Sequence, residues 1–137
     1  IAATGVKRLF LVNRTVSKAE AIAFEIGQRF PAVDVHVGYP QNEVDLVLNS
    51  TSLGLGKEEP LPLDTSAFAL NQSRAVYDMI YKPTETPLLA AAKAAGCKTA
   101  NGLGMLLHQG AKALEIWSGQ TAPIDVMRTA LKETIHE

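Results

Sequence analysis

The chain has 137 residues, 47% of them hydrophobic, which is enough for one globular domain with a core of its own. A formal net charge of −1, without a basic stretch that alternates with aromatic residues, argues against nucleic acid as a partner. The single cysteine, Cys97, excludes an internal disulfide and fits a reducing compartment. Since no apolar run reaches membrane-spanning length and no signal peptide is visible, we expect a cytoplasmic protein with no membrane contact.

The first predicted strand is the apolar run 9–12, which is typical of a strand buried on both faces of a parallel sheet. Residues 1–5 have the pattern of a last helical turn that ends at Gly5. No Gly-x-Gly-x-x-Gly loop precedes the strand, although dinucleotide-binding folds use such a loop to seat the pyrophosphate. We therefore expect an earlier strand and a glycine-rich turn upstream of residue 1.

The polar residues 13–15 follow this strand, where ligands bind in open α/β sheets. This corner holds Arg14 and, one helical turn later, Lys18, but no carboxylate that would repel the 2′-phosphate of NADP. The spacing of Ser17 and Glu20 predicts a capping box, and hence a helix N-terminus that favours an anion at the same corner. The alternative is that Arg14 is an ordinary solvated loop residue.

The following elements continue an alternation of helix and strand. A helix is predicted over 16–29, with one apolar stripe that covers a sheet face, and Pro31 ends it. Residues 33–37 alternate like a short strand near a sheet edge. In this strand we expect His36 to face solvent, without a partner nearby in the sequence.

A second strand that leads to a polar corner is predicted at 46–48, followed by the hydroxyl-rich residues 49–54. These residues form either a ligand site or an ordinary turn that caps itself, and the two interpretations have equal weight. The proline- and glycine-containing stretch 55–73 is predicted as a loop with a short helix at 65–70. Another strand is predicted over 75–81.

The last third of the chain is predicted to be mainly helical. Thr86 and Pro87 open a helix that ends at Gly96, and a short strand is expected at 98–100. A regular helix covers 102–118, and Pro123 starts a final amphipathic helix.

The helix at 102–118 has two faces of interest. Its core face is predicted to consist of Leu103, Leu106, Leu107, Gly110, Ala111, Leu114 and Trp117. On the neighbouring stripe Gly102 could admit a flat ring closely, and the Gln109 amide could bind a polar substrate. Periodicity alone favours the simpler interpretation, that Gln109 is a partly exposed residue of an amphipathic helix. Gly102-x-Gly104 lacks the third glycine of a phosphate-binding loop.

Four segments together resemble shikimate dehydrogenase. These segments are Val12–Thr15 with Lys18–Ala19; Asn49–Gly54; Tyr77–Tyr81 followed by Thr86–Leu89; and Gly102–Ala111 with Trp117. The motif Asn13-Arg14-Thr15 alone is also similar to glutamyl-tRNA reductase, and the segments around Tyr81 and Gln109 distinguish the two families. The resemblance spans nearly the whole chain but only the C-terminal, cofactor-binding half of the family.

The resemblance implies an α/β fold, Rossmann-like with three α/β/α layers and a mainly parallel sheet. Residues 1–120 would form the NADP-binding domain without its first strand and glycine-rich loop, and the helix in 121–137 would pack toward a substrate domain. The implied activity is NADPH-dependent reduction of 3-dehydroshikimate to shikimate, without a metal. The implied cofactor-binding residues are Asn13, Arg14, Thr15, Ser17, Lys18, Thr51, Ser52, Met79 and Gly102, and the implied substrate contacts are Tyr81 and Gln109. Lys18 stands where the family often has Arg, so it keeps the charge and loses the planar fork.

The catalytic Lys and Asp of the family belong to its N-terminal substrate domain, so no catalytic residue is assigned in this chain. We therefore expect the chain alone to be inactive, and the complete protein to be a monomer or a homodimer. Two alternatives remain open: a nucleotide-binding or regulatory module without redox chemistry, and a quinate/shikimate dehydrogenase paralogue.

Overall fold

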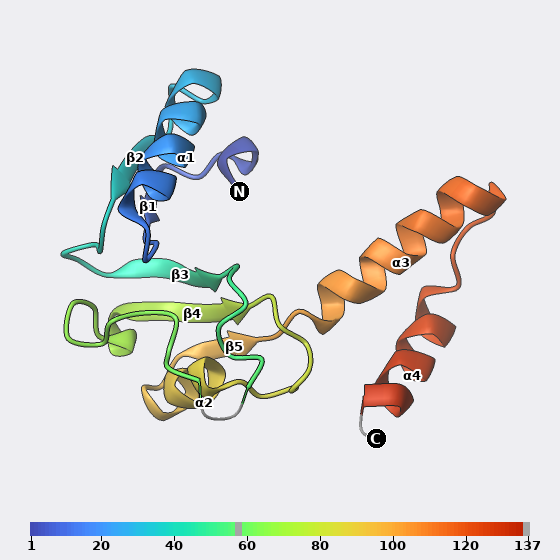
Figure 1. The fold of residues 1–137 in the computed structure, drawn as a ribbon. Helices are drawn as coiled ribbons and strands as arrows, with labels where there is room; N and C mark the ends of the chain where they lie inside the picture. Colours follow the sequence, from blue (N-terminus) through green and yellow to red (C-terminus); the bar gives the residue numbers. More distant parts are fainter. Residues whose placement is uncertain (57–58, 136–137) are drawn as a thin grey trace. The chain divides into compact units, whose positions relative to one another are not determined.

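The computed structural model describes residues 1–56 and 59–135, and the chain divides into two compact units (Figure 1). Unit 1 comprises Ile1–Glu43 and Leu63–Ala69, and unit 2 comprises Val44–Pro62 and Leu70–Glu137. Each unit has parallel strands joined through helical or looped connections, which confirms the predicted α/β class. The strands form two separate sheets, β1-β2 in unit 1 and β3-β4-β5 in unit 2.

Unit 1 is a β-α-β arrangement. Its elements are the 3-10 helix η1 (Ala2–Thr4), β1 (Arg8–Leu11), α1 (Val16–Arg29) and β2 (Asp34–Val37). The two strands pair in parallel from Arg8 opposite Asp34 to Leu11 opposite Val37. α1 packs against β2, with Ala19 as its buried residue. The predicted helix bounds are confirmed.

Three expectations for unit 1 are wrong. The residues Leu9–Leu11 of β1 are half-buried rather than buried on both faces, because β1 pairs with β2 alone among the described strands. The capping box does not form, because α1 begins at Val16 with Thr15 at its N-cap, which places Ser17 inside the first turn. His36 is solvent-facing as expected, but it has a partner after all.

The partner of His36 is a carboxylate on the same strand. His36 Nε2 lies 2.9 Å from Asp34 Oδ2, and the His36 ring stacks on Phe10 with centroids 5.1 Å apart. Residues two apart on a strand point to the same face, so the alternation of side chains along the strand is enough to predict this pair.

Unit 2 has a three-stranded parallel sheet in the order β3-β4-β5. Its elements are β3 (Val44–Asn49), η2 (Leu70–Gln72), β4 (Ser73–Asp78), α2 (Pro87–Ala94), β5 (Lys98–Ala100), α3 (Leu103–Ser118) and α4 (Ile124–Ile135). α2 packs on β4 and β5, and its Leu88 and Leu89 are buried together with Val76 of β4. Thr86 caps α2 by accepting the backbone N–H of Leu89 at 3.3 Å, with Pro87 at the first helical position, as the sequence predicts.

β4 ends at Asp78, three residues before the predicted end at Tyr81. The reason is local, because the Asp78 carboxylate accepts the N–H of Ile80 at 3.1 Å and so turns the chain out of the sheet. The short helix expected at 65–70 is a turn in which the N–H groups of Ala67 and Phe68 bond to the Asp64 carbonyl. The 3-10 helix η2 then follows at Leu70–Gln72.

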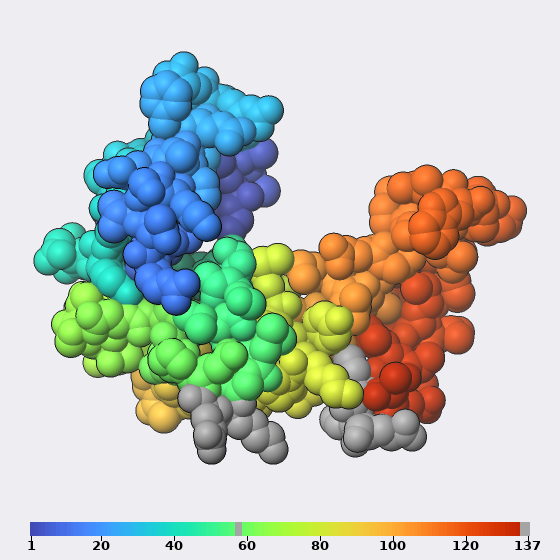
Figure 2. All heavy atoms as spheres, viewed as in Figure 1, coloured from blue at the N-terminus to red at the C-terminus, as the bar shows by residue number. Residues whose placement is uncertain are grey.

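α3 and α4 form an antiparallel pair, visible as the orange and red helices of Figure 1, and their atoms are in contact in Figure 2. Of the predicted core face of α3, Leu107 and Ala111 are buried as predicted, Leu103 and Leu106 are half-buried, and Gly110 is exposed. The prediction is wrong further on, because Leu114 is 38% exposed and Trp117 is 84% exposed. Within the described residues, no helix is long and apolar enough to cross a membrane.

Candidate functional site

In unit 1, the corner after β1 presents cations without carboxylate partners. Asn13 Oδ1 accepts the backbone N–H of Thr15 at 2.8 Å, and this bond shapes the turn. Arg14, Ser17 and Lys18 are exposed. Among the residues of unit 1, all of which the structure describes, no carboxylate lies within ion-pair distance of Arg14 or Lys18. The guanidinium is therefore available to a ligand.

The start of α1 adds to this corner. Thr15 is the N-cap residue, but its side chain makes no capping hydrogen bond, and no acidic residue lies in the first turn. The uncapped N–H groups of a helix start carry partial positive charge, which adds to the two cationic side chains. The corner is thus suited to an anion and poorly suited to a neutral hydroxyl.

In unit 2, the carboxyl ends of the strands come together at one edge. Asn49 lies opposite Asp78 in the β3-β4 register, and the N–H of Met79 donates to the Asn49 carbonyl at 3.0 Å. The N–H of Gly102 donates to the Ile80 carbonyl, also at 3.0 Å. The turn after β3, the segment after β4 and the start of α3 therefore meet at this edge.

Most of the predicted residues of unit 2 belong to these segments. Thr51 and Ser52 are exposed in the turn after β3, Met79 is half-buried, and Tyr81 is 39% exposed. Gln109 is exposed on α3, seven residues after Gly102, which is about 10 Å along the helix axis.

A buried polar cluster of Asn49, Asp78 and Thr86 lies beneath this edge. Asp78 and Thr86 are 0% exposed and Asn49 is 4% exposed. Asp78 Oδ1 accepts the Asn49 Nδ2–H at 3.0 Å, and Asp78 Oδ2 accepts the Thr86 hydroxyl at 2.7 Å. Burial of a carboxylate is tolerated when donors surround it, as they do here.

The Thr51 hydroxyl makes most of its possible hydrogen bonds within the protein. It donates to Asn49 Oδ1 at 2.8 Å and accepts the N–H of Leu53 at 3.2 Å. Since a hydroxyl has one donor and two acceptor lone pairs, Thr51 retains a lone pair and no proton. A ligand atom at Thr51 must therefore be a hydrogen-bond donor, such as an amide N–H, and not a phosphate oxygen.

Gly102 is required by packing. A Cβ at this position would lie 1.9 Å from the Met79 carbonyl oxygen. The backbone conformation itself is ordinary, with φ −71 and ψ 0, so close approach is the reason for glycine. Met79 and the start of α3 are consequently held against each other.

Glu59 turns back onto the glycine-containing turn after β3. Its Oε2 accepts the N–H of Gly54 at 2.7 Å. Hydrogen bonds from the backbone of Gly54, and then of Gly56, hold the pKa of the Glu59 carboxyl below its ordinary value of 4.5. This bond ties the far end of the turn to the loop that follows it.

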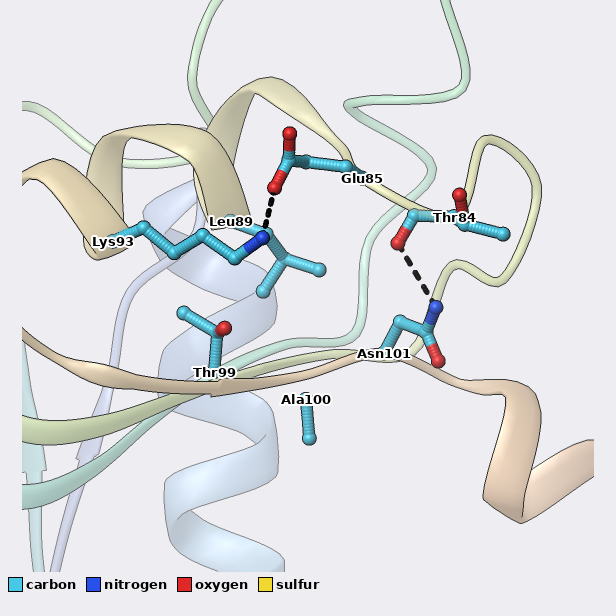
Figure 3. A pocket seen from close by; sticks show the side chains of 7 residues that line it. All are labelled: Thr84, Glu85, Leu89, Lys93, Thr99, Ala100 and Asn101. Carbon is cyan, nitrogen blue, oxygen red and sulfur yellow. Dashed lines mark hydrogen bonds and ion pairs between the residues drawn. The ribbon is translucent and has the colours of Figure 1, made fainter.

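An open hollow of about 260 Å³ lies beside the end of β5 (Figure 3). Its lining residues are Thr84, Glu85, Leu89, Lys93, Thr99, Ala100 and Asn101. Lys93 and Glu85 form an ion pair, and Asn101 Nδ2 donates to the Thr84 carbonyl at 2.9 Å. No predicted site residue lines this hollow, and its charges are already paired.

Sequence reasoning singled out the outward-facing residues of unit 2 and missed the role of the buried cluster. In the sequence, Asp78 is part of the segment Tyr77–Tyr81, Asn49 begins a polar turn and Thr86 is predicted as a helix cap, and none of the three is predicted to bond to another. The available signal was that β3 and β4 both end on a polar residue, since parallel strands of equal register place such residues side by side.

Comparison with known proteins gives a consistent family. Residues 102–132 match the family model of the shikimate 5′-dehydrogenase C-terminal domain. A shikimate dehydrogenase (NADP(+)) of Methanocella arvoryzae is 41% identical over 128 residues, which cover 91% of this chain and 47% of that protein. The chain spans about half the length of the curated relatives it matches.

Solved structures show the same fold. A shikimate dehydrogenase in complex with NADP+ matches with a TM-score of 0.78 and 29% identity, over 95% of this chain and 55% of that one. The quinate dehydrogenase of Corynebacterium glutamicum in complex with NAD matches with a TM-score of 0.78 and 28% identity, over 96% and 48%.

Proposed function

Since this chain belongs to the shikimate dehydrogenase family, we propose that it is the NADP(H)-binding half of an oxidoreductase that reduces 3-dehydroshikimate to shikimate. The observation that carries the proposal is the corner after β1. There, exposed Arg14 and Lys18 stand beside an uncapped helix start, with no carboxylate of unit 1 in ion-pair range. A 2′-phosphate satisfies such a corner by charge and by hydrogen bonding.

In this proposal each residue of the corner has a separate role in binding the 2′-phosphate. Arg14 binds the 2′-phosphate through two guanidinium N–H groups, and Lys18 contributes charge without the planar fork. Asn13 orders the turn through its bond to Thr15, and the hydroxyls of Thr15 and Ser17 add neutral donors.

The edge of unit 2 would serve the reactive end of the cofactor. Thr51, Ser52, Met79 and Gly102 would line the path to the nicotinamide. The remaining acceptor lone pair of Thr51 suits the N–H of a carboxamide, and the absence of a side chain at Gly102 lets Met79 lie against the start of α3. Tyr81 and Gln109 would contact the substrate.

NADPH held by these residues would supply the hydride for the substrate carbonyl carbon, and a protein group would have to supply the proton for the carbonyl oxygen. We assign no proton donor among the described residues at the edge of unit 2. We propose that the catalytic Lys and Asp come from outside this chain, which would then show no turnover alone. Exposed Val126 of α4 is consistent with contact to a further domain.

The test is titration of the complete protein that carries this chain with NADP+ and NAD+. Loss of a charge-assisted phosphate pair costs about 1.5–3 kcal/mol, so Arg14→Ala should weaken NADP+ binding by roughly ten- to a hundredfold and leave NAD+ binding nearly unchanged. Arg29→Ala is the matched control, because Arg29 lies at the opposite end of α1 and pairs with Glu25. Equal weakening of both nucleotides by Arg14→Ala would remove the 2′-phosphate assignment.

Turnover of candidate substrates distinguishes two alternatives from the proposed function. A nucleotide-binding module without redox chemistry would bind NADP+ but reduce neither 3-dehydroshikimate nor a related ketone. A quinate/shikimate paralogue would oxidise both quinate and shikimate, a possibility raised by the likeness to a quinate dehydrogenase. In a shikimate dehydrogenase and in a quinate/shikimate paralogue alike, Gln109→Ala should raise KM for the substrate while the affinity for NADP+ stays the same.

A further inference from the structure

We infer that Asn49, Asp78 and Thr86 are positioning residues that lock the two loops of the reactive edge, the turn 49–54 and the segment 79–86, into one arrangement. This inference rests on the proposed function, because these loops carry Thr51, Ser52, Met79 and Tyr81. None of the three cluster residues is exposed enough to bind a ligand itself. Their contribution must therefore pass through the residues they hold.

The cluster holds the turn after β3 through Asn49. Asn49 Oδ1 accepts both the N–H and the hydroxyl of Thr51, at 3.0 and 2.8 Å, and Asn49 Nδ2 donates to the Leu53 carbonyl at 3.0 Å. The same Nδ2 group donates its other proton to Asp78. One amide side chain thus fixes the conformation of the turn and connects it to β4.

The cluster holds both ends of the segment after β4 through Asp78. Its Oδ1 accepts the N–H of Ile80 at the start of the segment, and its Oδ2 accepts the hydroxyl of Thr86 at the end. Tyr81 lies between these two attachment points. The N–H of Gly102 then donates to the Ile80 carbonyl, which extends the connection to the start of α3.

Polar clusters of this kind hold their geometry in a nearly all-or-none manner. Every polar side-chain atom of the cluster that is buried has a partner, and the described residues include no buried side-chain N or O atom without one. Loss of one donor leaves a buried acceptor unpaired, so the neighbouring bonds rearrange with it. A change at Thr86 should consequently reach Thr51, although the two residues do not bond to each other.

The test compares three variants of the complete protein. Thr86→Val removes the hydroxyl and keeps the shape, Thr86→Ser keeps the hydroxyl, and Thr84→Val is the matched control because Thr84 is exposed in the same segment and uses only its backbone carbonyl. A misplacement of about 1 Å at a reacting centre can lower the rate up to a hundredfold. We therefore expect Thr86→Val to lower kcat/KM roughly ten- to a hundredfold, and Thr86→Ser and Thr84→Val to stay within about twofold of wild type.

A second readout separates positioning from simple destabilisation. The ratio of NADP+ to NAD+ affinity should stay at its wild-type value in Thr86→Val, because the proposed 2′-phosphate contacts are elsewhere. Activity per folded molecule is compared, so a lower melting temperature alone does not count. Unchanged kcat/KM of folded Thr86→Val would overturn the inference, and so would failure of Thr86→Ser to restore it.

Hydrogen exchange of the wild-type protein keeps the test independent of the variants. The Thr51 N–H donates to Asn49 Oδ1, and the Ile80 N–H donates to Asp78 Oδ1. If the cluster couples the two loops, these two amides exchange through the same opening, and their protection factors should lie within about threefold of each other. Widely different protection would refute the coupling. If wild type reduces no 3-dehydroshikimate, the proposed function fails, and the exchange data still decide whether the cluster joins the two loops.

Discussion

Substitution of Gly102 by Ala tests the closest approach in the structure. The added Cβ would lie 1.9 Å from the Met79 carbonyl oxygen, whereas real Cβ contacts essentially never fall below 3.0 Å. The start of α3 and the end of β4 would therefore have to separate by about 1 Å, a shift that a close-packed interior resists. The atom in the way is backbone, so no side chain can rotate aside.

The cost can be worked from two terms. Forcing a methyl group into a filled space costs about 1–3 kcal/mol, and stretching the hydrogen bond from Gly102 N–H to the Ile80 carbonyl adds about 1 kcal/mol. We expect Gly102→Ala to lower the free energy of unfolding by about 2–4 kcal/mol. Chemical denaturation of the complete protein measures this difference, with the slope checked for a change in the unfolding mechanism.

Gly104→Ala is the matched control. Nothing lies within 4 Å of a Cβ at Gly104, which sits in the first turn of α3. Ala is the better helix former by up to about 1 kcal/mol, so this variant should be as stable as wild type or more stable. If Gly102→Ala also matched wild type, the close approach of Met79 and α3 would not exist in solution.

Three further substitutions separate buried from exposed interactions. Glu59→Gln should lower the free energy of unfolding near neutral pH, and the difference from wild type should vanish in acid. The reason is that the pKa of Glu59 in the folded protein lies below 4.5. The stabilisation by its carboxylate is therefore present above pH 4.5 and is lost as the pH falls through the folded pKa. Thermal unfolding of both proteins across this range is the measurement, and a difference that grows in acid would contradict it. Leu88→Ala should cost about 2–5 kcal/mol in denaturant unfolding, because Leu88 is 1% exposed against the sheet. Arg74→Ala should cost less than about 1 kcal/mol in the same assay, since its pair with Asp45 is solvent-exposed, and a larger loss would show a contact beyond the ion pair.

The elements that could be predicted are those whose signals are local. α1 has the predicted bounds because its apolar period and its stop at Pro31 lie within the helix and its next neighbours. The start of α2 is likewise contained in Thr86 and Pro87, one residue that caps and one that fits only the first turn. Such signals act between residues a few positions apart, so no tertiary information is needed to use them.

Burial was harder to predict because it depends on what covers an element. The apolar run of β1 is half-buried since a single described strand pairs with it. Trp117 has the spacing of a core residue on α3 and is 84% exposed, because Ala111 is the last buried residue of this helix. Periodicity identifies the face of a helix but not the length over which that face is covered.

The candidate site shows the same division between local and distant information. Arg14 can be singled out because it follows a predicted strand and stands beside a predicted helix start, whereas Tyr81 is identified only through the resemblance to shikimate dehydrogenase. Asp78 could not be assigned a role, because its partner Asn49 lies 29 positions earlier in the sequence and becomes a neighbour only through the register of two parallel strands. Asp78 bonds to both ends of the segment that carries Tyr81, so we expect the position of Tyr81 to depend on a fully buried carboxylate three residues earlier. We therefore expect substrate specificity to respond to substitutions beneath the edge of unit 2 as well as to those on it.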